Sequence, residues 1–78
     1  MITGSQIRMA RASLRWTAKH LAEKAGLSWA TVQRMEAADG VPSASGKNLE
    51  AIQRALESAG VEFLAPDNGG PGVRLRGA

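Results

Sequence analysis

The chain has 78 residues, a net charge of +3 and no cysteine. A chain of this length forms one domain with a modest hydrophobic core, and the lack of cysteine excludes disulfide bonds and thiolate metal sites. No apolar run approaches the ~20 residues that cross a bilayer, and the first residues lack the basic and apolar regions of a signal peptide. We therefore expect a cytoplasmic protein without a membrane partner.

The charge is distributed unevenly along the chain. Up to Arg34, six basic residues accompany Glu23 alone, a net +5, whereas from Met35 onward four basic and six acidic residues give a net −2. A basic half joined to a mildly acidic half favours a polyanionic partner on one side. Basic proteins are common, so composition alone does not identify nucleic acid as that partner.

Signals for helix starts recur in the first half of the chain. Three times, an apolar residue precedes a hydroxyl residue and a second apolar residue follows four positions after it; the hydroxyls belong to Thr3, Thr17 and Ser28. Such a hydroxyl accepts a hydrogen bond from an N–H of the first helical turn, while the two apolar side chains pack together as a hydrophobic staple. Gln6 adds a capping box with Thr3.

Stop signals and apolar periodicity complete the helical prediction. Gly26 and Gly60 suit the position after a helix, and Ser43 or Ser45 caps a fourth helix. That helix has apolar residues at i, i+3 and i+7, which are Leu49, Ile52 and Leu56. We predict four helices, near residues 4–14, 18–25, 29–37 and 46–59.

The remaining tail changes period. Residues 61–63 and 73–76 alternate apolar and polar side chains, as half-buried strands do, and a turn-forming stretch rich in glycine and proline separates them. We expect a hairpin or two short strands around a mobile loop; disorder after Asp67 is the alternative. Because an isolated two-stranded hairpin is only marginally stable, the apolar residues of the tail must cover the helices or meet a second subunit.

The second and third predicted helices are joined by a short glycine-containing turn, which is the arrangement of a helix-turn-helix. The run from Trp16 to Glu36, WTAKHLAEKAGLSWATVQRME, resembles the lambda-repressor-like (Xre or Cro-type) family of DNA-binding proteins. The resemblance covers roughly residues 5–59 and implies a mainly α, four-helix DNA-binding domain over residues 1–60. The C-terminal β-hairpin or strand pair, residues 61–78, lies outside it as a dimerisation tail.

A helical wheel gives the third predicted helix two different faces. At about 100° per residue, Met35 and Glu36 fall with Val32 on the core side, and Ala30 and Arg34 lie nearly opposite. In the family that the chain resembles, bases are read by the first residues of this helix and by one residue a turn later. The expected base contacts are Trp29, Ala30, Thr31, Gln33 and Arg34.

Each of these residues also has a simpler interpretation. Arg34 is an ordinary solvated arginine or a bidentate partner of guanine, the commonest specific pairing. Ala30 either fills the helix or touches a thymine methyl group. Trp29 lies only about 60° from Val32 on the wheel, so packing against the second helix and contact with DNA are both open.

Phosphate contacts are expected at helix starts, where N–H groups and the positive end of the dipole attract anions. The residues assigned to this role are Thr17, Lys19, Ser28, Lys47 and Asn48. Members of the resembled family often carry a glutamine that touches phosphate where this chain has Ala18. That contact is missing here, and we expect Lys19 to replace it.

Glu36 is predicted on the core side of its helix, where an unpaired charge is costly. In the resembled family, the arginine of the first helix that matches Arg11 pairs with this glutamate. We therefore assign Arg11 and Glu36 to a structural ion pair and not to DNA binding.

Little in the sequence supports catalysis, so we expect no enzyme activity, cofactor or metal. His20 is the one histidine, and no glycine-rich phosphate loop follows a predicted strand. The resemblance implies a sequence-specific regulator of transcription that binds double-stranded DNA, either a repressor or an autoregulatory controller. The alternatives are an antitoxin that also represses its operon and meets a toxin, and a protein–protein interaction module on the same fold.

A homodimer on a palindromic operator is expected, because one recognition helix reads only a few base pairs. Two half-sites about one helical turn apart supply the missing specificity. The candidate interface residues are Ala55, Leu56, Ala59, Val61, Phe63 and Leu75.

Overall fold

The computed structural model describes residues 2–65 and 69–76. Its elements in chain order are α1 (Gly4–Ser13), α2 (Ala18–Ala25), α3 (Trp29–Ala37), α4 (Gly46–Ser58), β1 (Val61–Leu64) and β2 (Gly72–Leu75). The predicted fold class, four helices followed by a short strand pair, is confirmed. No helix in the described part of the chain is both long and apolar enough to cross a membrane.

Each helix begins at a hydroxyl residue that caps it. The Thr3 hydroxyl accepts from the backbone N–H of Gln6 at 3.1 Å, and the Gln6 side chain accepts from the backbone N–H of Thr3 at 2.9 Å. The predicted capping box is therefore present. Thr17, Ser28 and Ser45 cap the other three helices in the same way, so Ser45 and not Ser43 begins α4.

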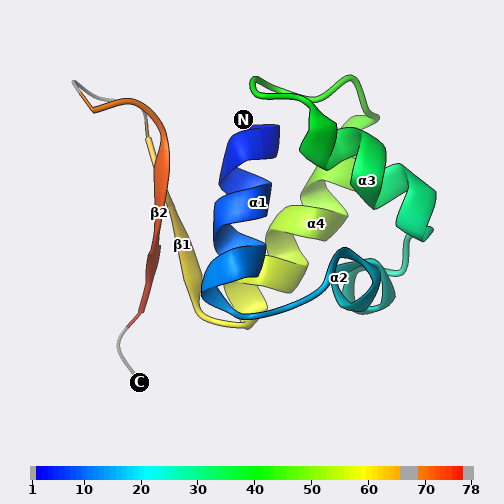
Figure 1. Cartoon of the computed structure of the whole chain (residues 1–78), viewed down its shortest axis with the longest axis horizontal. Coiled ribbons are helices and arrows are strands. Elements are labelled where there is room, and N and C mark those ends of the chain that lie inside the picture. The colour runs from blue at the N-terminus through cyan, green and yellow to red at the C-terminus, as the bar shows by residue number, and fades with distance from the viewer. Residues whose placement is uncertain (1, 66–68, 77–78) are drawn as a thin grey trace.

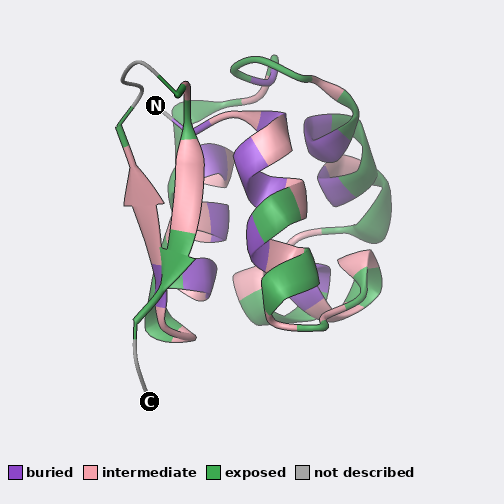
Figure 2. Cartoon of the chain, turned by 60° about the vertical axis from the view of Figure 1, so that its left-hand side comes forward, coloured by how far each residue is buried: buried purple, intermediate pink, exposed green. Residues whose placement is uncertain are grey.

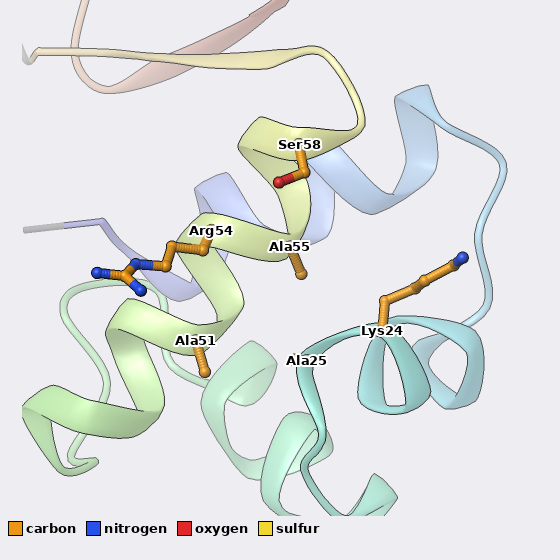
Figure 3. Close-up of a pocket in the computed structure, with 6 residues that line it drawn as sticks. All are labelled: Lys24, Ala25, Ala51, Arg54, Ala55 and Ser58. Atoms are coloured by element: carbon orange, nitrogen blue, oxygen red, sulfur yellow. The ribbon is translucent and has the colours of Figure 1, made fainter.

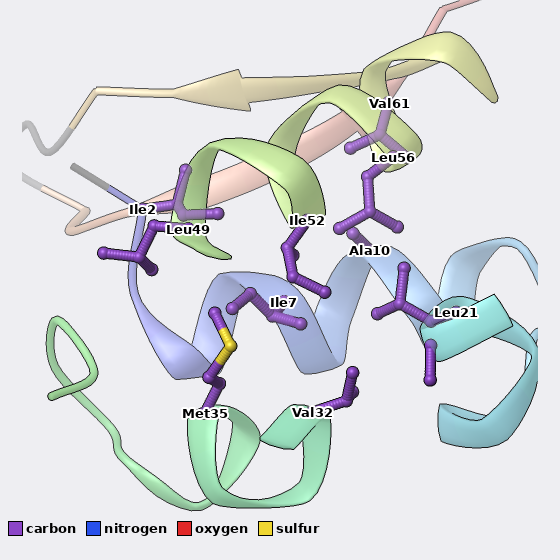
Figure 4. Close-up of a cluster of buried hydrophobic side chains, with 11 residues drawn as sticks. Ile2, Ile7, Ala10, Leu21, Val32, Met35, Leu49, Ile52, Leu56 and Val61 are labelled. Atoms are coloured by element: carbon purple, nitrogen blue, oxygen red, sulfur yellow. The ribbon is translucent and has the colours of Figure 1, made fainter. Parts of the chain in front are cut away.

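The helices enclose one hydrophobic core, and the hairpin packs on its far side. Figure 1 shows α1 between the hairpin and α3, and Figure 2 shows that the helices turn their buried faces inward. All four helices and β1 contribute to the core, as Figure 4 shows; its largest fully buried side chains are Ile7, Leu21, Val32, Ile52, Leu56 and Val61.

The start of α1 lies directly against the segment that follows α3. The N–H of Gly4 donates to the carbonyl of Gly40 at 2.9 Å. A Cβ atom at position 4 would lie 1.9 Å from the carbonyl oxygen of Ala38, so only glycine fits this close approach. The contact fixes the end of α3 relative to α1.

The two strands pair antiparallel, with Val61 opposite Leu75 and Phe63 opposite Val73. These four apolar residues share the side that faces the helices, where Val61 is buried and both Phe63 and Val73 pack against the core. The tail thus covers the helices, one of the two outcomes that its apolar residues predicted. Residues 66–68 of the predicted loop and the last two residues of the tail lie outside the described residues.

Gln6 also attaches the hairpin to the helices. Its Nε2 donates to the carbonyl oxygens of Leu64 and Gly72, at 3.2 and 2.9 Å. The side chain is buried, and each of its polar atoms has a partner. One amide therefore joins the first turn of α1 to both strands.

Candidate nucleic-acid interface

Helices α2 and α3 are joined by a tight turn. Gly26 adopts the left-handed conformation, with φ of 70°, and its successor Leu27 donates its N–H to the carbonyl of Ala22 at 2.9 Å. Glycine occupies this conformation at little steric cost, so the chain can reverse within a few residues. Ser28 then starts α3 at once, which gives the compact helix-turn-helix that the sequence predicts.

The two faces of α3 differ as the helical wheel predicts. Val32, Met35 and Glu36 are buried, with exposed fractions of 0%, 2% and 6%. On the opposite side Ala30 and Arg34 are exposed, and Gln33 and Ala37 are exposed beside them. The hairpin packs beyond α1, at the other end of the molecule in Figure 1, so it does not cover the outer face of α3.

Thr31 connects the start of α3 with Arg34. Its Oγ1 lies 2.8 Å from the hydroxyl oxygen of Ser28 and accepts a long hydrogen bond from Nη2 of Arg34, at 3.4 Å. Thr31 is half-buried, so its hydroxyl serves the helix as well as the surface. The wheel places Thr31 on the flank of α3, but its hydrogen bond to Arg34 was not predicted, although the i, i+3 spacing is a usable signal.

Trp29 projects from the first turn of α3 and is 53% exposed. It is absent from the partly buried residues that pack against the core, whereas Trp16 belongs to that group. Trp16 makes an edge-on contact with His20, with ring centroids 4.8 Å apart. Of the two interpretations of Trp29, the exposure disfavours packing against α2 and leaves a large apolar side chain at the surface.

The residues assigned to phosphate contacts lie at helix starts. Thr17 accepts from the N–H of His20 at 3.0 Å, and Ser28 accepts from the N–H of Thr31 at 3.2 Å. Lys19 and Lys47 are exposed in the first turns of α2 and α4, and Asn48 is half-buried. Both lysines therefore stand beside the positive end of a helix dipole, where an anion is favoured.

The predicted pair of Arg11 and Glu36 is present. Nε of Arg11 lies 2.9 Å from Oε2 of Glu36, Nη2 lies 3.0 Å from Oε1, and Nη1 donates to the carbonyl of Trp16 at 2.9 Å. The Glu36 side chain is 8% exposed and that of Arg11 27%. This two-point contact joins the inner face of α3 to the end of α1.

A second arginine of α1 is also used within the fold. Arg8 donates to Asp39 at 2.9 Å and to the hydroxyl of Ser5 at 3.0 Å, and it also donates to the backbone carbonyl of Glu36. The sequence analysis did not predict this pair, since no spacing rule links a helix to a distant loop. Two of the six basic residues that make the first half positive are therefore matched inside the chain.

The remaining basic residues of that half take part in no ion pair among the described residues. They are Arg15, Lys19, Lys24 and Arg34, and Lys47 at the start of α4 is likewise unmatched. Arg34 and Lys19 belong to the helix-turn-helix itself. The unmatched charge therefore includes two cations on the helices that the sequence assigns to DNA.

The candidate dimer interface needs correction. Leu56 and Val61 are 0% and 1% exposed because they fill the core of their own chain, so neither can contact a second subunit. Ala55 lines a hollow of about 400 Å³ between α2 and α4, shown in Figure 3, and Ala59 lines a neighbouring one. Phe63 packs against the core, which leaves Leu75 as the large apolar candidate at the surface, at 46% exposure.

Comparisons with known proteins do not assign the chain to a family. No protein-family model matches it, and a search of curated proteins finds no match. The functional argument therefore depends on the residues and their geometry.

Proposed function

We propose that the chain is a sequence-specific regulator of transcription that binds double-stranded DNA through α3. It resembles the lambda-repressor-like type and acts in the cytoplasm as a homodimer on a palindromic operator, as a repressor or autoregulatory controller. The observation that carries the proposal is the two-sided α3. One face is locked into the core by Val32 and Glu36, and the other presents Ala30 and Arg34 to solvent.

The dimensions and chemistry of α3 suit the major groove. An α-helix with its side chains is about 10–12 Å wide, and the groove is about 12 Å wide. In this position the guanidinium of Arg34 donates two hydrogen bonds to O6 and N7 of a guanine, and Gln33 pairs with N6 and N7 of an adenine. Ala30 and the indole of Trp29 supply apolar contact for a thymine methyl group.

Contacts to phosphate hold α3 in the groove. The starts of α2 and α4 present backbone N–H groups beside Lys19 and Lys47, and the hydroxyls of Thr17 and Ser28 and the amide of Asn48 add polar contacts. Such contacts position the protein without reading sequence, and they make binding weaken as salt rises.

Rigid placement of α3 is the task of the matched charges. The bidentate contact of Arg11 with Glu36 and the approach of Gly4 to Ala38 tie α3 to α1 at two points. A side chain that reads a base must be held to within a fraction of an ångström, and buried, hydrogen-bonded supports provide this.

Selection of bound duplexes from a random library tests the proposal. We expect a palindromic consensus that contains a guanine whose preference is lost in Arg34→Ala. The same selection in rising salt should show a steep loss of affinity. If the chain binds no duplex in a salt-dependent manner, the DNA proposal is wrong and a protein-binding module is favoured.

A further inference from the structure

The hairpin presents one exposed strand edge. The sheet formed by the described residues has only two strands, so each strand pairs on one side. β1 is buried or half-buried throughout, whereas β2 becomes exposed toward its end. Leu75 lies opposite Val61 on the helix-facing side, but it is 46% exposed while Val61 is 1% exposed. The apolar row beneath the sheet therefore ends in an uncovered leucine at the edge of β2.

The register shows which backbone groups point outward. Arg76 donates its N–H to the carbonyl of Gly60 at 2.8 Å, so these two residues form a hydrogen-bonded pair of the antiparallel ladder. Such pairs alternate with pairs whose backbone groups point away from the partner strand. Val73 and Leu75 belong to the second kind. Their N–H and C=O groups therefore face the open edge of β2.

We propose that this edge binds the same edge of a second copy of the chain, antiparallel, with the two-fold axis at Arg74. This inference rests on the dimeric function proposed above and gives the dimer a surface and a register. Val73 then pairs with Leu75 of the second copy, and the reverse pair follows from symmetry. Together the two pairs satisfy all four outward groups of each strand. An axis at Val73 would instead place Pro71, which has no N–H, opposite Leu75.

Side chains and charges agree with this register. Val73 and Leu75 of both copies lie on one side and extend the apolar row of Val61 and Phe63 across a four-stranded sheet. On the other side, Arg74 meets Arg74 of the second copy. Each arginine is already matched by Glu62 across the hairpin at 2.9 Å, so the row of four charges is neutral.

The pairing leaves the proposed DNA surface accessible. The hairpin and α3 lie toward opposite ends of the long axis of the molecule in Figure 1, along which the chain extends 32 Å. A second copy bound at β2 therefore covers neither α3. Arg34 and Ala30 of both subunits stay available for two half-sites.

Cysteine cross-linking of the full chain tests the register, because the natural sequence contains no cysteine. In the proposed dimer, position 74 faces its copy in a pair with Cα atoms about 4.5 Å apart, within the range of a disulfide. Arg74→Cys should form a covalent dimer with oxidised glutathione in the absence of DNA. Glu62→Cys is the matched control, on the same face but three strand spacings from its copy, about 14 Å.

The outcomes separate this inference from the DNA proposal. Cross-linking of Arg74→Cys but not of Glu62→Cys supports the β2 pairing. Equal cross-linking of both variants, or none in either with unchanged thermal unfolding, overturns it. A palindromic consensus obtained with the unmodified chain would then remain valid and place the dimer contact elsewhere, whereas cross-linking without DNA binding would refute the DNA proposal alone.

A second pair of variants tests the backbone contact directly. Leu75→Pro and Leu75→Ala both remove the exposed leucine side chain, but only proline also removes the N–H that faces the edge. In sedimentation experiments, we expect the alanine variant to weaken self-association and the proline variant to abolish it. Equal dimerisation by both variants would contradict strand pairing at this edge.

Discussion

The inner and outer faces of α3 use charge in opposite ways. On the inner face, Glu36 is nearly buried and is matched by Arg11 at two points. On the outer face, Arg34 is exposed and its one recorded partner is the hydroxyl of Thr31. A charge matched inside the chain fixes the position of the helix, and a charge left unmatched is available to a partner. The comparison predicts that substitutions on the two faces affect different measurements.

The largest effect is expected when the inner pair is broken. Removing one partner of a buried pair costs roughly 3–5 kcal/mol, and because Arg11 is 27% exposed, Glu36→Ala should fall near 3 kcal/mol. Arg11→Ala should cost more, since it leaves the less exposed carboxylate without a cation. Denaturant unfolding measures both values. Unchanged stability in both variants would show that the pair contributes nothing to the fold.

Much of this inner face was predictable from the sequence, because helix starts and apolar spacing are local signals. The hydroxyls of Thr3, Thr17 and Ser28 cap their helices, and the burial of Val32 and Glu36 follows from a wheel of 100° per residue. The choice of Ser45 over Ser43 was not predictable, because both offer the same cap and only tertiary packing selects between them.

Contacts between distant segments were less predictable. The second role of Gln6, which holds both strands of the hairpin, carries no sequence signal beyond its capping box. Leu56 was assigned to a dimer interface, although its own apolar stripe with Leu49 and Ile52 places it in the core. An apolar side chain does not reveal from sequence whether its own chain or a second one covers it.

The next largest effect is expected on the outer face and in DNA binding alone. Arg34→Ala should weaken binding to the selected operator by about 1–3 kcal/mol and relax the preference at one base position. Its unfolding free energy should stay within about 0.5 kcal/mol of the unmodified chain, because the side chain is exposed. Arg8→Ala is the matched control: it removes an arginine that the fold uses, so stability should fall and base preference should persist.

A smaller effect is expected at the start of α4. Lys47 is exposed and takes part in no ion pair among the described residues. Lys47→Ala should weaken binding to all duplexes alike and reduce the slope of log K against log salt by about 0.9, the change for one phosphate contact. Lys24→Ala, which removes an unmatched lysine at the far end of α2, should leave that slope unchanged. Fluorescence anisotropy at several salt concentrations measures both variants.

The smallest effect is expected where the two faces of α3 meet. Thr31→Val keeps the shape of the side chain but removes the hydroxyl that accepts from Arg34. We expect at most about 0.5 kcal/mol of lost operator affinity, because an exposed, long hydrogen bond only orients the guanidinium. Thr31→Ser, which keeps the hydroxyl, should restore binding in the same anisotropy assay. A loss as large as that of Arg34→Ala would mean that Thr31 contacts a base itself, and the border between the two faces would move by one residue.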